Sequence, residues 1–282
     1  MHPAPGPTIR KPSPAAAAAA ILSIFLFLPA GEARAFCGLI DAQAPSAPHA
    51  RPRAAGREVL LTFDAAWSAD GADAVLDTLR SEGVRATFFL AGRFIASNTR
   101  IVRRIAGEGH EAGNHTWSHG HLTRYGIDGT RTTLSGVTRS GLLHEMEATD
   151  REFLQVTGRH LAPIWRAPFG ETNPEILGWT LRAGWTHVGW SEGMDTLDWV
   201  DDPASRLYHS PESTVRRILA ELAARPDSRG PAVILMHLGS TRDPARRFSR
   251  ALPTLIAGCR ALGYRFVTFG ESHLQAVAVA GP

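Results

Sequence analysis

The sequence predicts an α/β fold, a distorted (β/α) barrel of about seven parallel strands with a TIM-like layout. Three observations support this prediction. Short apolar segments alternate with amphipathic helical patterns along most of the 282 residues. The apolar segments are continuous rather than alternating, which is typical of parallel strands covered on both faces. About seven strand–helix units fit into roughly 220 residues, a length typical of a barrel.

The strands are predicted where several apolar or β-branched residues follow one another, as in EVLLTF and AVILMH. In chain order these segments are 58–63, 85–90, 110–114, 162–166, 186–190, 232–237 and 264–269.

The helices are predicted where apolar residues recur at steps of three and four, as they do from Leu142 to Val156. Gly83 and Gly158 follow two of these patterns and are typical helix-ending residues. The segment 120–139 is polar and glycine-rich, so we expect a long loop there, near the site. In chain order the predicted helices are 72–83, 98–109, 142–158, 174–184, 211–225 and 246–263.

The N-terminal segment has the pattern of a secretory signal peptide. Arg10 and Lys11 precede an apolar run, and Ala33-Arg34-Ala35 forms a small-residue cleavage site. A retained membrane anchor is the alternative, but the run is shorter than the roughly 20 residues that span a bilayer. We therefore expect a secreted or periplasmic protein with no stable membrane anchor. The predicted organisation is a signal peptide (1–35), a disordered Pro- and Ala-rich lead-in (36–57), one domain (58–275) and a tail (276–282).

Charge and cysteine content limit the partners. The net charge is only +3, and Lys11 is the only lysine, so no lysine-rich stripe suggests nucleic-acid binding.

The two cysteines, Cys37 and Cys259, are compatible with a disulfide in an oxidising compartment, and the sequence leaves this pairing open. The sequence does not indicate an oligomeric state.

Polar residues follow the apolar runs at four of the predicted strand ends. They are Asp64, the pair His115 and His119, Arg166 and His237. Because the carboxyl ends of barrel strands form one rim, we expect these side chains to converge there. Each also has a purely structural interpretation: a helix cap or ion pair for Asp64, two surface or core histidines for His115 and His119, a structural ion pair for Arg166, and a core histidine for His237.

The two histidines of HTWSH are four residues apart, a spacing that would place both imidazoles on one side of a helical turn. Two imidazoles on one side can share a metal ion. Imidazole ligands suit zinc and disfavour magnesium or calcium. We therefore expect a divalent metal, with zinc preferred, at His115 and His119.

Five segments in order, TFDAAW, HTWSH, RAPFG, DTLDW and LMH, resemble the motifs of the polysaccharide deacetylase family, the NodB-homology domain of carbohydrate esterase family 4. The resemblance covers about Val59 to Leu274. It implies a distorted barrel and a metal-assisted hydrolase that removes N- or O-acetyl groups from a glycan. Peptidoglycan or an exopolysaccharide would be the substrate.

The resemblance also implies roles for single residues. Asp64 matches the general base, with Arg166 holding it, and His115 and His119 match metal ligands. His237 matches the general acid.

Four further positions complete the expected site. Asp198 matches the carboxylate that orients the acid, and Trp199 and Leu235 match an apolar wall around the acetyl methyl group. A backbone N–H near Phe169 is a candidate donor to the oxyanion.

One position departs from the family pattern. The family usually has a second aspartate, a metal ligand, where this chain has Ala65. Four consequences remain open: water fills the position, Asp64 binds the metal, another side chain reaches in (Asp70, Asp73 or His121), or the site is metal-poor and inactive. If the site is inactive, the chain is a catalytically impaired glycan-binding relative. Separately, the resemblance leaves open a deformylase of a lipid-linked aminosugar, because some members of the family have that activity.

Overall fold

The structure is a computed structural model that describes residues 57–272 and 274. The predicted signal peptide, almost all of the lead-in, Cys37 and the tail lie outside the described residues. Cys259, the other cysteine, is buried. Within the described range, no helix combines the length and the apolar character needed to cross a bilayer.

Among the described residues, seven strands form one sheet, and every pairing between these strands is parallel. Their bounds are β1 Glu58–Ala65, β2 Thr87–Leu90, β3 Glu111–Asn114, β4 Ile164–Trp165, β5 Thr186–His187, β6 Ala232–His237 and β7 Arg265–Phe266. The order is β5-β4-β3-β2-β1-β6, and β7 pairs with the start of β1.

The gap between the end strands β5 and β6 is bridged by the segment 191–196, which follows β5. The Ser191 N–H donates to Val233 O at 3.0 Å, the Leu235 N–H to Met194 O at 2.9 Å, and the Thr196 N–H to Leu235 O at 3.1 Å. The sheet therefore curves into the distorted barrel that the sequence predicts.

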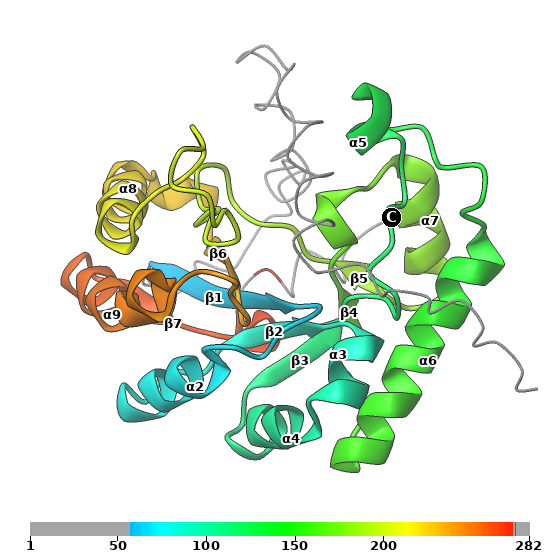
Figure 1. Cartoon of the computed structure of the whole chain (residues 1–282), viewed down its shortest axis with the longest axis horizontal. Helices are drawn as coiled ribbons and strands as arrows, with labels where there is room; N and C mark the ends of the chain where they lie inside the picture. Colours follow the sequence, from blue (N-terminus) through cyan, green and yellow to red (C-terminus); the bar gives the residue numbers. More distant parts are fainter. Residues whose placement is uncertain (1–56, 273, 275–282) are drawn as a thin grey trace, which may run out of the picture.

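The helices surround the strands (Figure 1). Going round the sheet, α2, α4, α6, α7, α8 and α9 follow in chain order (Figure 1), while α3 lies beside α6. The α-helices are α2 Ala72–Ser81, α3 Gly92–Ser97, α4 Thr99–Gly107, α5 Tyr125–Asp128, α6 Arg139–Thr157, α7 Pro174–Arg182, α8 Pro211–Ala224 and α9 Leu252–Ala261. The 3₁₀ helices are η3 Pro168–Gly170, η4 Asp227–Arg229, η5 Pro244–Arg246, η6 Phe248–Arg250 and η7 Phe269–Glu271.

Local sequence explains where several helices begin and end. The side chains of Thr138, Asn173 and Ser210 each accept a hydrogen bond from a backbone N–H in the first turn of α6, α7 and α8. Gly158 ends α6 in the left-handed conformation, at φ 72°. The prediction of one helix over 246–263 is wrong, because α9 begins only at Leu252, where the following proline fits the first turn but not a helix interior.

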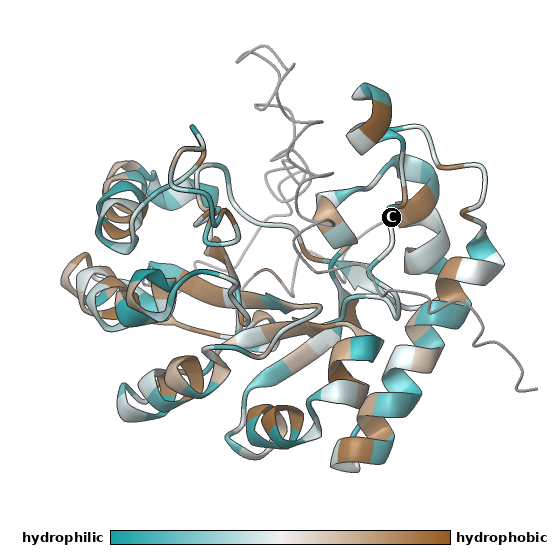
Figure 2. Cartoon of the chain, in the orientation of Figure 1, coloured by the Kyte–Doolittle hydropathy of each residue, from teal (hydrophilic) through white to brown (hydrophobic). Residues whose placement is uncertain are grey.

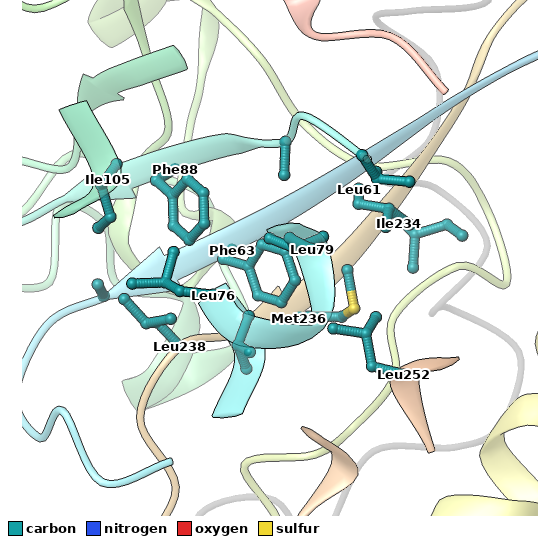
Figure 3. Packing of buried hydrophobic residues seen from close by; sticks show 14 of the residues in the cluster. Leu61, Phe63, Leu76, Leu79, Phe88, Ile105, Ile234, Met236, Leu238 and Leu252 are labelled. Atoms are coloured by element: carbon teal, nitrogen blue, oxygen red, sulfur yellow. The ribbon is translucent and has the colours of Figure 1, made fainter. Parts of the chain in front are cut away.

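The main hydrophobic core lies between the strands and the surrounding helices. Phe63 of β1 stacks on Phe88 of β2 with ring centroids 5.1 Å apart, and Leu76, Leu79 and Leu252 close around them (Figure 3). Burying each such side chain stabilises the fold by about 1.5–3 kcal/mol. In Figure 2 much of β1 is brown, β3 is paler, and the helices carry both colours, as expected for helices that bury one face.

Alternation along β1 places its polar residues inside the barrel. Phe63 and Ala65 belong to the helix-side core, whereas Leu60 belongs to a smaller cluster inside the barrel. Because side chains alternate along a strand, Thr62 and Asp64 share the inner face with Leu60. Asp64 therefore lies at the carboxyl end of the barrel interior.

Candidate active site

Asp64 is held by a buried arginine. It is 8% exposed, and the Nη1 of Arg166 donates to its Oδ1 at 2.8 Å and to Thr62 Oγ1 at 2.9 Å. The other guanidinium nitrogens donate to Val188 O at 2.9 Å and to Gly189 O at 3.0 Å. The guanidinium therefore keeps one fixed orientation, directly after β4, and presents one edge to the carboxylate.

The surroundings of Asp64 favour its ionised form. Burial raises the pKa of its carboxyl, but the positive charges of Arg166 and His237 and the hydrogen bond from Arg166 outweigh burial and lower that pKa below its usual value. Asp64 is therefore a carboxylate that can accept a proton.

The two predicted metal ligands lie beside this carboxylate. The rings of His115 and His119 meet edge to face with centroids 4.8 Å apart. His115 Nε2 lies 3.6 Å from Asp64 Oδ2. The structure thus brings together three of the predicted site residues from β1 and from the segment after β3.

The chemistry of these histidines fits a cation. His115 Nδ1 pairs with Arg166 O at 2.8 Å, and because a carbonyl only accepts, Nδ1 carries the proton and Nε2 presents a lone pair. Burial lowers the pKa of both imidazoles, and that of His119 to about 3. Buried His115 Nε2 and His119 Nδ1 have no hydrogen-bond partner among the described residues. A lone pair facing a carboxylate oxygen is satisfied by a metal ion or a water molecule.

A complete ligand set of three side chains is not formed. Among residues 57–272 and 274, no group of three or more His, Cys, Asp or Glu side chains is arranged to hold a metal ion. Ala65 is 1% exposed and packs in the helix-side core. Asp73 forms ion pairs with two arginines of α4, and His121 Nδ1 pairs with Glu171 at 2.7 Å. Asp64 lies beside His115, whereas Asp73 and His121 have partners elsewhere.

The HTWSH segment is not helical, so the prediction of a helical turn is wrong. Thr116 and His119 have φ angles of 60° and 54°, in the left-handed region. Glu145 of α6 holds the loop by accepting from the Trp117 and Ser118 N–H groups, each at 3.2 Å. The two imidazoles meet because this loop is held, and not because of helical spacing.

The predicted acid forms a pair with its predicted partner. His237 Nδ1 lies 2.7 Å from Asp198 Oδ1, and the His237 N–H donates to Asp198 Oδ2 at 3.0 Å. Burial lowers the pKa of His237, but the Asp198 charge and hydrogen bond, with Asp64 and Asp195, raise it to about 9. His237 is therefore protonated at neutral pH and can donate a proton.

The acid and the base lie on neighbouring strands. His237 at the end of β6 is the direct register partner of Asp64 in β1. The two groups thus face one rim, as the sequence predicts.

Three residues are expected near the acetyl group, Leu235, Trp199 and Phe169, and their side chains differ in solvent exposure. Leu235, two residues before His237 on β6, is buried, and Trp199 follows Asp198 and is partly exposed. Phe169 is exposed and has a φ of 57°.

Backbone strain collects in the same loops. Among the described residues, the non-glycine residues with positive φ are Thr116, His119, Phe169 and Leu197. All four lie in the HTWSH, RAPFG and DTLDW segments. Such conformations cost about 1–3 kcal/mol each and cluster at functional sites.

Sequence reasoning missed the residues that hold these loops. The buried Arg242 donates to Val200 O at 2.8 Å, His209 O at 2.9 Å and Leu197 O at 2.8 Å. The buried Glu171 accepts from two backbone N–H groups of the 120–139 segment. The only feature of the sequence that marks Arg242 and Glu171 is their position in loops after predicted strands. Many other polar residues have such positions, so this feature alone does not identify the two.

Comparisons with known proteins identify the family. The sequence model of the family described as Polysaccharide deacetylase matches residues 51–188. A chitooligosaccharide deacetylase of Bradyrhizobium sp. is 30% identical over 226 residues, which cover 77% of this chain and 91% of that protein. A peptidoglycan N-acetylglucosamine deacetylase of Listeria monocytogenes is 27% identical over 81% of this chain, which spans 41% of that longer protein.

Solved structures show the same fold. The crystal structure of a CE4 family pseudoenzyme from Bacillus anthracis is 22% identical to this chain, with a TM-score of 0.60 over 76% of this chain and 64% of that one. At this identity the likeness is one of fold alone.

Proposed function

Because the chain belongs to the polysaccharide deacetylase family, we propose that it is a hydrolase that removes acetyl groups from a glycan. One observation carries the proposal. An ionised Asp64 held by Arg166 and a protonated His237 held by Asp198 are register partners on adjacent strands. A base and an acid in opposite protonation states are what amide hydrolysis requires.

In the proposed reaction, Asp64 takes a proton from the water molecule that attacks the acetyl carbonyl carbon. The carbon–nitrogen bond then breaks, His237 gives its proton to the departing amine, and acetate is released. Asp198 stabilises the charged imidazole before this transfer. Leu235 and Trp199 form the apolar wall next to the methyl group, and the Phe169 loop supplies a backbone donor to the carbonyl oxygen.

His115 and His119 are the residues that would hold a divalent metal, with zinc preferred because both ligands are imidazoles. When bound, the metal would polarise the acetyl carbonyl and lower the pKa of water. Ala65 removes one usual ligand, so we propose a weaker site in which Asp64 or water takes the third position.

One feature argues against a purely glycan-binding relative. Arg166 holds the carboxylate of Asp64 and Asp198 separately holds the imidazole of His237, a division into base and acid that glycan binding alone does not require. The loss of the usual second aspartate at Ala65 is the observation that favours the impaired alternative.

The substrate and location are also proposals. Relatives named for peptidoglycan and for chitooligosaccharide make a polymeric N-acetyl glycan, such as peptidoglycan or an exopolysaccharide, the first choice. The signal-like N-terminal segment supports a secreted or periplasmic location, where such polymers are found.

The experiment is to measure acetate release from peptidoglycan, chitotetraose and an acetylated exopolysaccharide during zinc titration. The Asp64→Asn protein is the matched control. Acetate release by the wild type alone supports the proposal. Glycan binding without acetate release at any metal concentration would support the impaired relative, and formate release from a formylated aminosugar would support the deformylase.

A further inference from the structure

The segment between β5 and β6 carries a carboxyl group that the proposed reaction does not use. Asp195 lies three residues before Asp198 and is bridged to Leu235 of β6. Its Oδ1 accepts a hydrogen bond from the Leu197 N–H at 2.8 Å. An aspartate side chain that bonds to the backbone N–H two residues on forms a local turn. Asp195 therefore forms such a turn directly before Asp198.

The backbone of Asp195 itself is fixed by two neighbouring elements. The Thr196 N–H donates to Leu235 O of β6 at 3.1 Å. Arg217 of α8 donates to Asp195 O. The Asp195 side chain thus starts from a backbone that is held on both sides, so it can hold the residues that follow.

The chain bends immediately after this fixed part. Leu197 has a φ of 54°, in the left-handed region, which is unfavourable for a residue with a large side chain. Other side chains hold both of its backbone polar groups. The Leu197 N–H donates to Asp195, and Leu197 O accepts from Arg242 Nη2 at 2.8 Å. Because a strained backbone conformation persists only where its surroundings hold it, Asp195 and Arg242 together stabilise this bend.

The bend at Leu197 determines where Asp198 lies. Asp198 is the next residue and is buried, and its Oδ1 lies 2.7 Å from His237 Nδ1. The backbone dihedral angles of one residue set the direction of the chain that follows. Release of the bend would therefore move the Asp198 carboxylate away from the imidazole.

We propose that Asp195 is a positioning residue for the acid of the reaction. By holding the bend at Leu197, it directs the Asp198 carboxylate onto His237 Nδ1. The catalytic part of this inference rests on the proposed deacetylase function, because Asp195 acts through His237. The placement of Asp198 does not depend on that function.

An effect of the Asp195 charge alone is the alternative. Burial lowers the pKa of His237, and the Asp198 charge and hydrogen bond, followed by the charges of Asp64 and Asp195, raise it to about 9. The Asp195 charge is thus one of several carboxylate charges near the imidazole. Variants that separate this charge from the turn distinguish the two possibilities.

The test compares substitutions that keep or remove the turn. Asp195→Asn keeps a side-chain acceptor for the Leu197 N–H but removes the charge, whereas Asp195→Ala removes both. Asp202→Ala is the matched control, because Asp202 Oδ1 forms the same kind of turn with the Ala204 N–H at 2.9 Å, beyond Asp198. Thermal melts confirm folding. If Asp195→Ala does not fold, Asp195→Ser replaces it, because a hydroxyl accepts more weakly.

Acetate release from chitotetraose in the presence of zinc measures the effect on the acid. Asp195→Ala should lower kcat about 10- to 100-fold with KM unchanged, because the acid acts only in the transition state. Asp195→Asn should recover most of kcat, and Asp202→Ala should match the wild type. A loss of stability in Asp195→Ala without a loss of kcat would show that Asp195 supports only the fold.

The proton on His237 Nδ1 gives a second measurement that needs no turnover. A hydrogen bond to a carboxylate shifts the NMR resonance of this proton downfield and slows its exchange with water. His237→Gln identifies the resonance in isotope-labelled full-length protein. The resonance should persist in Asp195→Asn and Asp202→Ala and be lost in Asp195→Ala. Its persistence in Asp195→Ala, or its equal loss in Asp195→Asn, would overturn the proposal.

The two proposals fail in different ways. If the wild type releases no acetate but the resonance is lost only in Asp195→Ala, the deacetylase function is wrong and the positioning of Asp198 by Asp195 remains. If the wild type releases acetate and Asp195→Ala retains both kcat and the resonance, the positioning role alone is wrong.

Discussion

Asp198 contacts His237 twice, through the imidazole Nδ1 at 2.7 Å and through the backbone N–H at 3.0 Å. The carboxylate thereby fixes both the orientation and the charge of the imidazole. The pKa of His237 is raised to about 9 from an ordinary 6.5, and this shift affects how both activity and stability depend on pH.

The first prediction concerns the alkaline limb of activity. His237 is protonated below its pKa, so kcat/KM should fall as pH rises through about 9. Asp198→Asn removes the main raising interaction, so the alkaline limb should move to lower pH. The exposed Asp201→Asn change in the same loop is the control. A limb that stays in place in Asp198→Asn would show that His237 is not the acid.

The same pKa shift affects stability. Because folding raises the His237 pKa, its contribution is fully present below about 6.5 and is lost as pH rises through about 9. Urea unfolding of the wild type should show this loss, and Asp198→Asn should show a smaller loss over the same window.

The second prediction concerns Asp64→Asn. The amide keeps the shape and can accept from Arg166 but cannot take the proton, so kcat should fall about 10²- to 10⁴-fold. Stability should fall, but by less than in Arg166→Ala, because the amide still accepts from Arg166 while the buried guanidinium loses its counter-charge. Acetate release and urea unfolding measure the two effects. Near-normal kcat would exclude Asp64 as the base.

The third prediction concerns Arg166. Arg166→Ala leaves the Asp64 carboxylate buried without its partner, which typically costs about 3–5 kcal/mol. We expect a lower free energy of unfolding together with a loss of activity. Arg166→Lys keeps the charge but cannot serve all the acceptors of the guanidinium, so its stability should be intermediate. Wild-type stability and kinetics in Arg166→Ala would contradict this role.

Much of the barrel could be predicted because its strands are continuous apolar runs. AVILMH, for instance, forms β6 with the predicted bounds, Ala232–His237. Asp64 and His237 lie close together because adjacent parallel strands end at the same edge of the sheet. This placement depends on the sheet and not on the conformation of the loops.

The loops could not be predicted in the same way, because tertiary contacts decide them. The HTWSH spacing suggests a helical turn, yet the loop is held by Glu145, which is 27 residues from Ser118 in sequence. Gly92 permits this arrangement, since a Cβ there would lie 2.1 Å from the Trp117 ring. Contacts between residues so far apart in the chain leave no periodic pattern in the sequence, so they could not be predicted from it.

The fourth prediction concerns metal binding. The wild type should bind zinc in calorimetry, and His115→Ala and His119→Ala should each weaken the Kd at least tenfold. His144→Ala, an exposed histidine on α6, is the control. Chelation should reduce acetate release and zinc should restore it. Unchanged catalysis after chelation and in His115→Ala would contradict a metal-assisted reaction.

The fifth prediction concerns Arg242, which joins the loop after β6 to the loop that carries Asp198. Its planar guanidinium donates to Leu197, Val200 and His209 carbonyls and lies 4.6 Å from the Tyr208 ring centroid. A lysine ammonium cannot reproduce this fork, so some of the buried carbonyls lose their donor. We expect Arg242→Lys to reduce stability by about 1–3 kcal/mol.

The loss of these hydrogen bonds in Arg242→Lys should also change the catalytic activity. Freeing the loop around Asp198 weakens its contact with His237, so Arg242→Lys should lower kcat and move the alkaline limb of kcat/KM to lower pH. Arg206→Lys, an exposed change in the same loop, is the control. A destabilised Arg242→Lys protein with the wild-type pH profile would show that Arg242 supports the fold without positioning the acid.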